Sequence, residues 1–319
     1  MTTLTDLVEV DALGADHYRA VTDSPLSRPT LFGGALVAQA LRAAAASTDP
    51  DKYPHSVHAT FVRAGRAGNG VEFTVARTRD GRSFSTRQVT VSQGERVVMT
   101  MTASFHRDEP SPEYQRPADL PAPGPDEALA ARSAGGADGA GETGPARRDM
   151  TAIDLVEVGE PTGARYLAWA RSRQELPADR VLHACAMAFL SDCGAPGVAA
   201  SAIGLEAGGP DQAGHGAPMT TSLDHAMWFH RAGRCDDWVL VSAVPLSTAS
   251  SRGLVLGSVH DRGGRHLASF TQELLIRPAD RRELDGVEIL AYRWAEAAIR
   301  HEPLGGSRVP QTGLSGLRR

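Results

Sequence analysis

The sequence contains almost no lysine, few aromatic residues and no long hydrophobic run. Lys52 is the only lysine among 33 basic residues, and such a bias toward arginine is typical of a GC-rich genome. No apolar run approaches the roughly 18 residues that a membrane-spanning helix needs. The first residues have neither the basic start nor the apolar centre of a signal peptide. We therefore expect a protein that neither enters a membrane nor is secreted.

Cysteine is scarce as well, with Cys185, Cys193 and Cys235 as the only three. An odd number argues against a complete disulfide framework, and the spacing of the cysteines and of the 11 histidines matches no zinc motif. We expect a reducing, cytoplasmic environment and no metal site. The net charge of −5 argues against nucleic acid as a partner.

One stretch rich in Pro, Gly, Ala and acidic residues divides the chain. Residues 108–149 contain almost no large apolar side chain after Tyr114, so they cannot bury enough surface to offset the entropy of ordering. We interpret this stretch as a linker that is mostly mobile. It separates an N-terminal module, residues 1–107, from a C-terminal module, residues 150–278, and residues 279–319 form a C-terminal extension.

The two modules resemble each other in sequence. Each has one apolar helix, then a His-Ala segment that ends in Arg-Ala-Gly, then runs that alternate with a period of two and are typical of strands. The His-Ala segments start at His58 and His225. The predicted helices are Gly33–Ser47 and Val181–Leu190, the latter with Asp179 as N-cap and Gly194 as C-cap. The predicted strands are Glu72–Thr78, Phe84–Ser92, Arg96–Phe105, Trp238–Val244, Gly253–His260 and His266–Arg277.

Both predicted helices are apolar almost all round. A surface helix carries a single apolar stripe, whereas a helix that is apolar on every side is covered on most of them. One helix wrapped by a curled antiparallel sheet is the hot-dog layout. We therefore predict an α+β double hot-dog with two tandem modules, and the alternative is a chance similarity between two α+β segments.

Two polar residues occur where apolar ones are expected. Asp192 follows the second apolar helix, and a buried carboxylate there needs hydrogen-bond donors. Gln272 is the only polar residue on one face of the strand His266–Arg277, and a buried amide also needs partners. The alternatives are an Asp192 that faces water and a Gln272 whose partners are backbone groups. The corresponding face of the first module has no amide and reads Val97, Met99, Met101, Ala103 and Phe105.

Several motifs resemble those of type II acyl-CoA thioesterases. The resemblance covers roughly residues 5–107 and 150–277, and the run from Leu223 to Arg231, LDHAMWFHR, is its most specific part. The other matching motifs are Leu31-Phe-Gly-Gly34, Gln39-Ala-Leu41, His55-Ser-Val-His58, Arg79-Asp-Gly-Arg-Ser-Phe-Ser85, Ser251-Arg-Gly253 and Gln272-Glu273.

The resemblance implies hydrolysis of an acyl-CoA or acyl-carrier thioester by a water molecule, without a cofactor. It places the catalytic carboxylate on Asp192, the hydroxyl on Ser222 and the amide on Gln272. We expect these three side chains to face one another. Modules of this fold commonly pair, so a homo-oligomer is expected. Six further residues are expected to bind substrate or line the cleft: Phe32, Gly33, Gly34, His58, Asp224 and Trp228.

Other enzyme classes lack their motifs in this sequence. A serine α/β-hydrolase needs G-x-S-x-G, which does not occur. A hot-dog dehydratase or hydratase would pair a histidine with an aspartate, and neither D-x-N-P-x-H nor H-x-x-x-G-x-x-x-x-P is present. A non-enzymatic module that binds acyl thioesters is the remaining alternative, and the retained trio argues against it.

Overall fold

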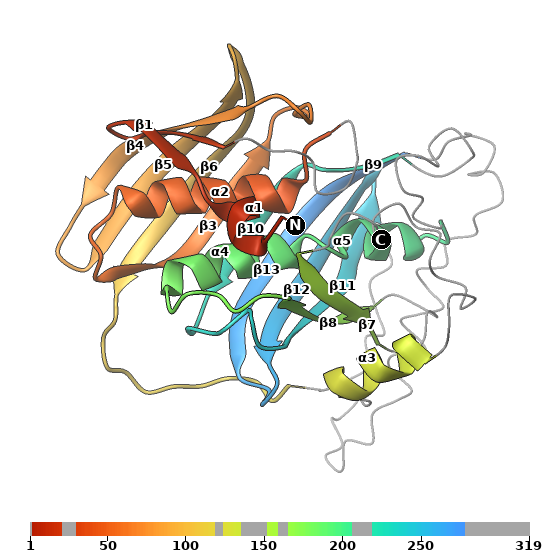
Figure 1. Cartoon of the computed structure of the whole chain (residues 1–319). Coiled ribbons are helices and arrows are strands. Elements are labelled where there is room, and N and C mark those ends of the chain that lie inside the picture. The colour runs from red at the N-terminus through yellow and green to blue at the C-terminus, as the bar shows by residue number, and fades with distance from the viewer. Residues whose placement is uncertain are drawn as a thin grey trace, which may run out of the picture.

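The computed structural model describes residues 2–20, 30–118, 124–134, 152–158, 165–205 and 219–277 (Figure 1). The Gly-rich stretch after Leu205 and the C-terminal extension lie outside these ranges. The first module contains α1 (Leu4–Val8), β1 (Asp11–Gly14), β2 (His17–Ala20), α2 (Gly33–Ala46), β3 (Lys52–Phe61), β4 (Val71–Asp80), β5 (Phe84–Gln93) and β6 (Arg96–Arg107). The remaining elements are α3 (Pro125–Ala134), β7 (Ile153–Glu157), β8 (Tyr166–Ser172), α4 (Arg180–Ser191), α5 (Ala195–Ser201), β9 (Met219–Ser222), β10 (Asp224–Phe229), β11 (Val239–Ala249), β12 (Arg252–Asp261) and β13 (His266–Arg277).

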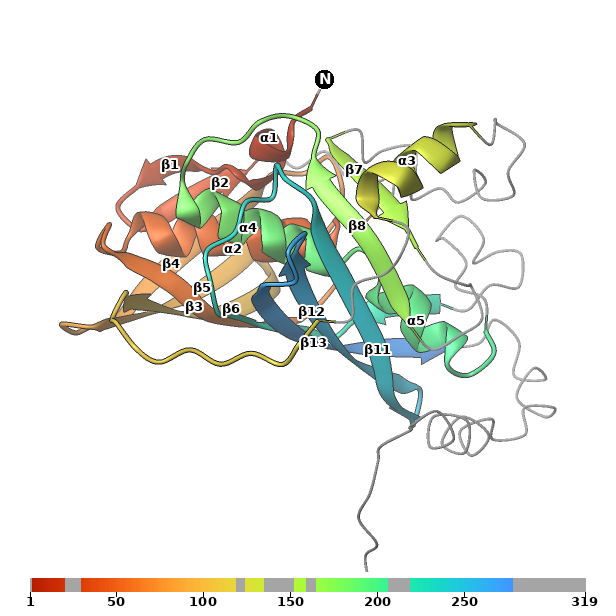
Figure 2. The same cartoon turned by 90° about the horizontal axis from the view of Figure 1, so that it is seen from below.

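The strands form one antiparallel sheet that runs through both modules. Its order is β1-β2-β4-β5-β6-β3-β10-β13-β12-β11-β8-β7, and β9 pairs with β13. Strands β3 and β10 join the modules, with Thr60 opposite Asp224 and Ser56 opposite Trp228. Helices α2 and α4 lie side by side on one face of this sheet (Figures 1 and 2). The architecture is the double hot-dog that the repeat predicts.

Helices α2 and α4 are buried on nearly all sides, as their composition predicts. Each packs against the sheet and against the other helix. Their small alanines allow a close approach, and the core is filled by Leu36, Leu41, Met187 and Phe189. The segment Arg180–Ser201, which contains α4 and α5, is apolar and long enough to cross a membrane by composition. However, 78% of its most apolar window is buried inside the protein. We therefore assign it to the core.

The ends of α4 differ in part from the prediction. Asp179 is the N-cap, and its side chain accepts hydrogen bonds from the backbone N–H groups of Val181 and Leu182, as predicted. The C-cap is Asp192, not Gly194, because Gly194 is instead the N-cap of α5. The carboxylate of Asp192 is therefore placed directly at the end of the buried helix.

The structure corrects the register of the internal repeat. Phe61 ends β3 opposite Met99, and Phe229 ends β10 opposite Ala268. In both modules Arg-Ala-Gly begins two residues after this phenylalanine. Phe61 and Phe229 are therefore equivalent positions. Matching the repeats at the histidines, as the His-Ala segments suggest, is wrong by one residue.

This one-residue difference decides which way each histidine points. Side chains alternate between the two faces of a strand, so a shift of one residue reverses the face. On β3, Val57 and Ala59 are buried against the helices, and His58 is exposed on the opposite face. On β10, His225 is only 1% exposed and points toward the helices. The two histidines therefore have different environments despite the similar sequence around them.

The stretch 108–149 is not as free of structure as its composition predicts. It contains helix α3, whose Ala128 is buried against Trp169 and Trp238 in a small apolar cluster. The indole Nε1 of Trp238 donates a hydrogen bond to Asp126 Oδ1 at 3.0 Å. Residues 125–134 of the predicted linker therefore form a helix that packs against the second module. A short alanine-rich helix needs only a small apolar face to dock, so a scarcity of large apolar side chains does not exclude it.

Candidate active site

Asp192 connects the two helices at the centre of the molecule. Its side chain is buried, with 6% of the residue exposed. Oδ2 accepts a hydrogen bond of 2.7 Å from the backbone N–H of Gly34, in the first turn of α2. The N-cap of α2, Phe32, makes no side-chain capping bond. The carboxylate of the second module therefore acts as the acceptor at the start of the first module's helix, where the helix dipole favours negative charge.

Gln272 holds the other side of the carboxylate. Gln272 is fully buried on the inner face of β13, between Phe270 and Leu274. The amide Nε2 donates to Asp192 Oδ1 at 2.6 Å and to Ser222 Oγ at 2.7 Å. A carboxylate only accepts hydrogen bonds, so the amide nitrogen must face it. The lone amide on the apolar strand face thus has the two partners expected for it.

Ser222 completes the trio at the end of β9. It is partly exposed, and its position is fixed by pairing of β9 with β13, where Ser222 lies opposite Leu274. Since its Oγ accepts from Gln272 Nε2, the hydroxyl proton of Ser222 can be donated to another group. The structure therefore brings together Asp192, Ser222 and Gln272, with the partly exposed hydroxyl beside the buried carboxylate.

Gly33 and Gly34 make this close approach possible. A Cβ at Gly34 would lie 2.7 Å from the Phe189 carbonyl oxygen and 2.9 Å from Asp192 Cβ. A Cβ at Gly33 would lie 3.0 Å from Asp192 Oδ2. Phe32 packs edge-on against Phe189, with ring centroids 5.0 Å apart. These three predicted residues lie at the trio, and the two glycines serve the contact between helix ends.

His58, Trp228 and Asp224 are placed differently. His58 and Trp228 lie on the outer face of the sheet, with ring centroids 5.4 Å apart, and strand alternation directs both away from the trio. Their expected place near the cleft is therefore corrected. Asp224 Oδ1 accepts a hydrogen bond of 2.8 Å from the Glu273 backbone N–H, and burial raises its pKa. We interpret Asp224 as a residue that ties β10 to β13.

His225 lies beside the trio, although it was not among the predicted site residues. The imidazole is buried, and its Nε2 lies 2.9 Å from Ser191 Oγ. Burial lowers the pKa of His225 to about 4. The imidazole is therefore neutral at ordinary pH. The signal in the sequence is the alternation along β10, which places His225 on the same buried face as Met227.

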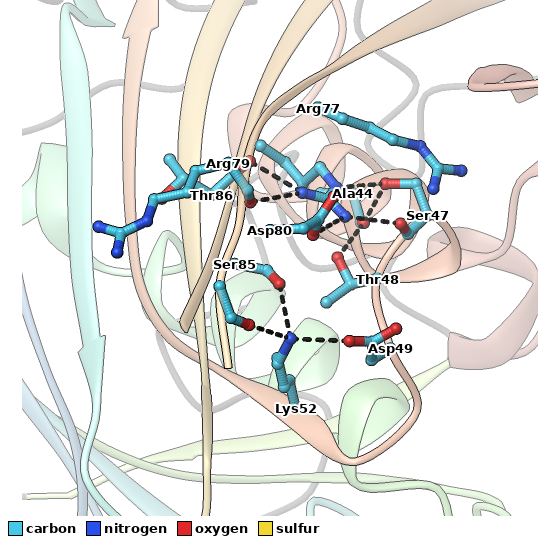
Figure 3. Close-up of polar contacts among 12 residues, drawn as sticks. Ala44, Ser47, Thr48, Asp49, Lys52, Arg77, Arg79, Asp80, Ser85 and Thr86 are labelled. Carbon is cyan, nitrogen blue, oxygen red and sulfur yellow. Dashed lines mark hydrogen bonds and ion pairs between the residues drawn. The ribbon is translucent and has the colours of Figure 1, made fainter. Parts of the chain in front are cut away.

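Among the described residues of the first module, the positions equivalent to Asp192 and Gln272 do not form a second trio. Met99 and Ala268 are equivalent positions on β6 and β13. Ala103 lies four residues after Met99, and Gln272 lies four residues after Ala268, so alanine takes the place of the amide. The C-cap of α2, equivalent to Asp192, is Ser47. Its Oγ accepts from Arg87 Nε at 2.9 Å, as part of a polar cluster at the end of α2 (Figure 3).

The same cluster contains the only lysine. Lys52 is 3% exposed, and its Nζ donates to Asp49, to Ser85 Oγ and to the Gly81 carbonyl (Figure 3). Arg87 NH2 also pairs with Asp80 at 2.7 Å. These contacts hold the end of α2 to the β4–β5 hairpin. They give both buried cations a structural explanation.

A small cavity lies at the other end of the junction between the modules. Its volume is about 130 Å³, and it lies at the start of α4 between the ends of β3 and β10. Pro54 and Phe229, which line it, are the equivalents of Ser222 and Phe61 in the corrected register.

Within the described residues, no group of three or more His, Cys, Asp or Glu side chains could hold a metal ion.

Two family models together match residues 22–276. The acyl-CoA thioesterase N-terminal domain matches residues 22–106, and the acyl-CoA thioesterase C-terminal domain matches residues 103–276. Acyl-coenzyme A thioesterase 8 of Rattus norvegicus is 31% identical over 299 residues, which cover 87% of this chain and 90% of that protein. The chain belongs to the type II acyl-CoA thioesterase family.

Solved structures related to this thioesterase have the same architecture. The acyl-CoA thioesterase II of Mycobacterium marinum is 30% identical, with a TM-score of 0.68 and coverage of 86% of this chain and 98% of that one. A hot-dog protein from Alicyclobacillus acidocaldarius matches with a TM-score of 0.67 at 17% identity, over 87% of this chain and 99% of that one. The hot-dog fold predicted from the sequence is confirmed.

Proposed function

We propose that this thioesterase hydrolyses acyl-CoA thioesters with a water molecule that Asp192, Ser222 and Gln272 position together. The observation that carries the proposal is the amide of Gln272, which bonds to both the buried carboxylate and the hydroxyl. A buried trio of polar groups is costly to maintain for stability alone. A carboxylate beside a partly exposed hydroxyl is instead suited to binding and activating water.

The proposed water lies between Asp192 and Ser222. The two carboxylate oxygens of Asp192 accept from Gly34 and Gln272, and Ser222 Oγ accepts from Gln272. The water donates one proton to Asp192 and accepts the hydroxyl proton of Ser222. Its remaining lone pair then points toward an acyl carbonyl carbon.

The reaction needs two bond changes. The water oxygen attacks the thioester carbonyl carbon while Asp192 takes a water proton, and the tetrahedral intermediate then loses the carbon–sulfur bond. The coenzyme A thiolate is a good leaving group and takes up a proton afterwards, so no strong general acid is needed. The Gly34 N–H is engaged by Asp192, and Gly33 and Gly194 are then the glycines whose N–H groups could polarise the carbonyl.

A dehydratase is disfavoured by the environment of the histidine. Such an enzyme moves a proton with a His–Asp pair, whereas Asp192 is bonded to Gly34 and Gln272 and His225 to Ser191. Burial of His225, which lowers its pKa to about 4, also makes it a weak base at neutral pH. A binding module without catalysis would bind acyl-CoA and release no thiol.

An assay of thiol release tests the proposal. The wild-type protein is incubated with acyl-CoAs of several chain lengths, and free thiol is followed with a chromogenic disulfide. We expect steady release of coenzyme A by the wild type and little release by Asp192→Asn. Binding of acyl-CoA without thiol release would indicate a binding module, and hydration or dehydration of the acyl chain would indicate the dehydratase.

A further inference from the structure

Two buried polar atoms beside the proposed site have no hydrogen-bond partner in the described part of the chain. They are Gln272 Oε1 and His225 Nδ1. The residues lie on the paired strands β13 and β10, where Ala226 is opposite Thr271 and His225 is therefore next to Gln272. The amide of Gln272 lies close enough to the imidazole to raise its pKa, although burial lowers that pKa more. The two atoms are thus candidates to satisfy each other.

Counting protons decides how they can do so. Both hydrogens of Gln272 Nε2 are used, one by Asp192 and one by Ser222. Gln272 Oε1 can therefore only accept, and it needs a donor. A neutral imidazole carries one N–H, and only the tautomer with that proton on Nδ1 provides the donor. In the other tautomer, two buried acceptors without protons would face each other.

Ser191 can stabilise the required tautomer. Its Oγ lies 2.9 Å from His225 Nε2 and 2.9 Å from the Ala188 carbonyl oxygen. A carbonyl oxygen only accepts, so the single serine proton goes either to Ala188 or to Nε2, and only the second arrangement keeps the imidazole proton on Nδ1. The ring of His225 is further held by stacking on Phe270, with centroids 5.7 Å apart. The position of the ring is therefore held by its neighbours, whereas its tautomer depends on where the serine proton points.

We propose that His225 is a positioning residue that holds the amide of Gln272 in its productive orientation through an Nδ1–H···Oε1 hydrogen bond. The proposal rests on the proposed function of the trio. Rotating the amide by half a turn would present Oε1 to the Asp192 carboxylate, and acceptor would face acceptor. His225 prevents this rotation without touching water or substrate.

Substitution kinetics test the role in catalysis. His225→Met removes the donor at similar volume and should lower kcat about tenfold or more, with little change in KM. His225→Asn places an amide N–H near the former Nδ1 and should restore much of the lost kcat. His183→Met is the matched control: it removes another buried imidazole, which accepts from the Cys235 backbone N–H, and should leave kcat near wild type. Equal kcat for wild type and His225→Met would overturn the proposal.

A double-mutant cycle separates positioning from general destabilisation. If His225 acts through the amide, His225→Met should cost little further activity in a Gln272→Met background. Independent, additive losses in kcat would contradict the proposal, because they would show that the imidazole acts elsewhere.

The tautomer can also be read without activity. Nitrogen-15 NMR of the histidine side chains in the wild-type protein should show His225 protonated at Nδ1. The signal is assigned to His225 because it disappears in His225→Met. A proton on Nε2 would overturn the proposal even if the trio is catalytic. Conversely, full activity of Asp192→Asn would defeat the proposed function, while the NMR result would still decide the pairing of His225 with Gln272.

Discussion

The backbone N–H of Gly34 donates a 2.7 Å hydrogen bond to Oδ2 of Asp192, across 158 residues of sequence. The donor belongs to the first module and the acceptor to the second. The bond places the proposed general base at the amino end of α2, where the helix dipole favours the ionised carboxylate. The proposed site is thus shared between modules, although all three members of the trio come from the second.

Gly34→Ala should disrupt this contact. The added Cβ would lie 2.7 Å from the Phe189 carbonyl oxygen and 2.9 Å from Asp192 Cβ, so the helix ends must separate. We expect lower kcat and a lower melting temperature, measured by thiol release and by circular dichroism. Gly14→Ala is the matched control, since a Cβ there meets nothing within 4 Å. Wild-type kinetics for Gly34→Ala would show that the contact is dispensable.

Asp192→Asn should lower kcat by about 10² or more, the usual scale for the loss of a positioned general base. Ser222→Ala and Gln272→Ala should each cost less, because they orient the water and do not take its proton. Kinetics of thiol release at saturating acyl-CoA measure these effects, with circular dichroism as the control for folding. A folded Asp192→Asn protein with nearly full activity would refute the assignment of the base.

Each chain should have one productive site. At the positions equivalent to Asp192 and Gln272, the first module has Ser47 and Ala103. Calorimetric titration with a non-hydrolysable acyl-CoA analogue should give one equivalent bound per chain. Two equal sites, or turnover that remains in Asp192→Asn and is abolished by Gln39→Ala, would show that the first module is catalytic.

Helix α3 should contribute to stability. Asp126→Ala removes the acceptor of the buried Trp238 indole N–H, and we expect the melting temperature to fall by roughly 2–4 °C. Glu127→Ala, an exposed neighbour, is the control. Equal melting temperatures for the two variants would support the original interpretation as a dispensable linker.

The sequence predicted the core elements closely because their patterns are strong. The strand His266–Arg277 matches β13 at both ends, and α2 and α4 differ from the predicted helices by one residue at the ends. Gln272 was found because a single amide interrupts an apolar face. The apolar helices and the alternating strand are patterns within one helix or strand, so they can be recognised without knowing which elements pair.

The misplaced residues depended on information that one strand does not contain. His58 and His225 occur in similar sequences, and only the pairing of β3 with β10 shows that they point to opposite faces. Helix α3 docks through Ala128 on a surface made by Trp169 and Trp238, which are distant in sequence. The homo-oligomer and the cytoplasmic location stay predictions.

The pairing of β3 with β10 has a consequence for how the protein folds during synthesis. During synthesis the first module emerges with one edge of β3 unpaired and one side of α2 uncovered, and its partner strand begins only at Asp224. An exposed strand edge readily pairs with another chain. A nascent or truncated first module should therefore associate with a second copy of itself through the same edge. Full-length translation replaces that intermolecular partner with the chain's own second half.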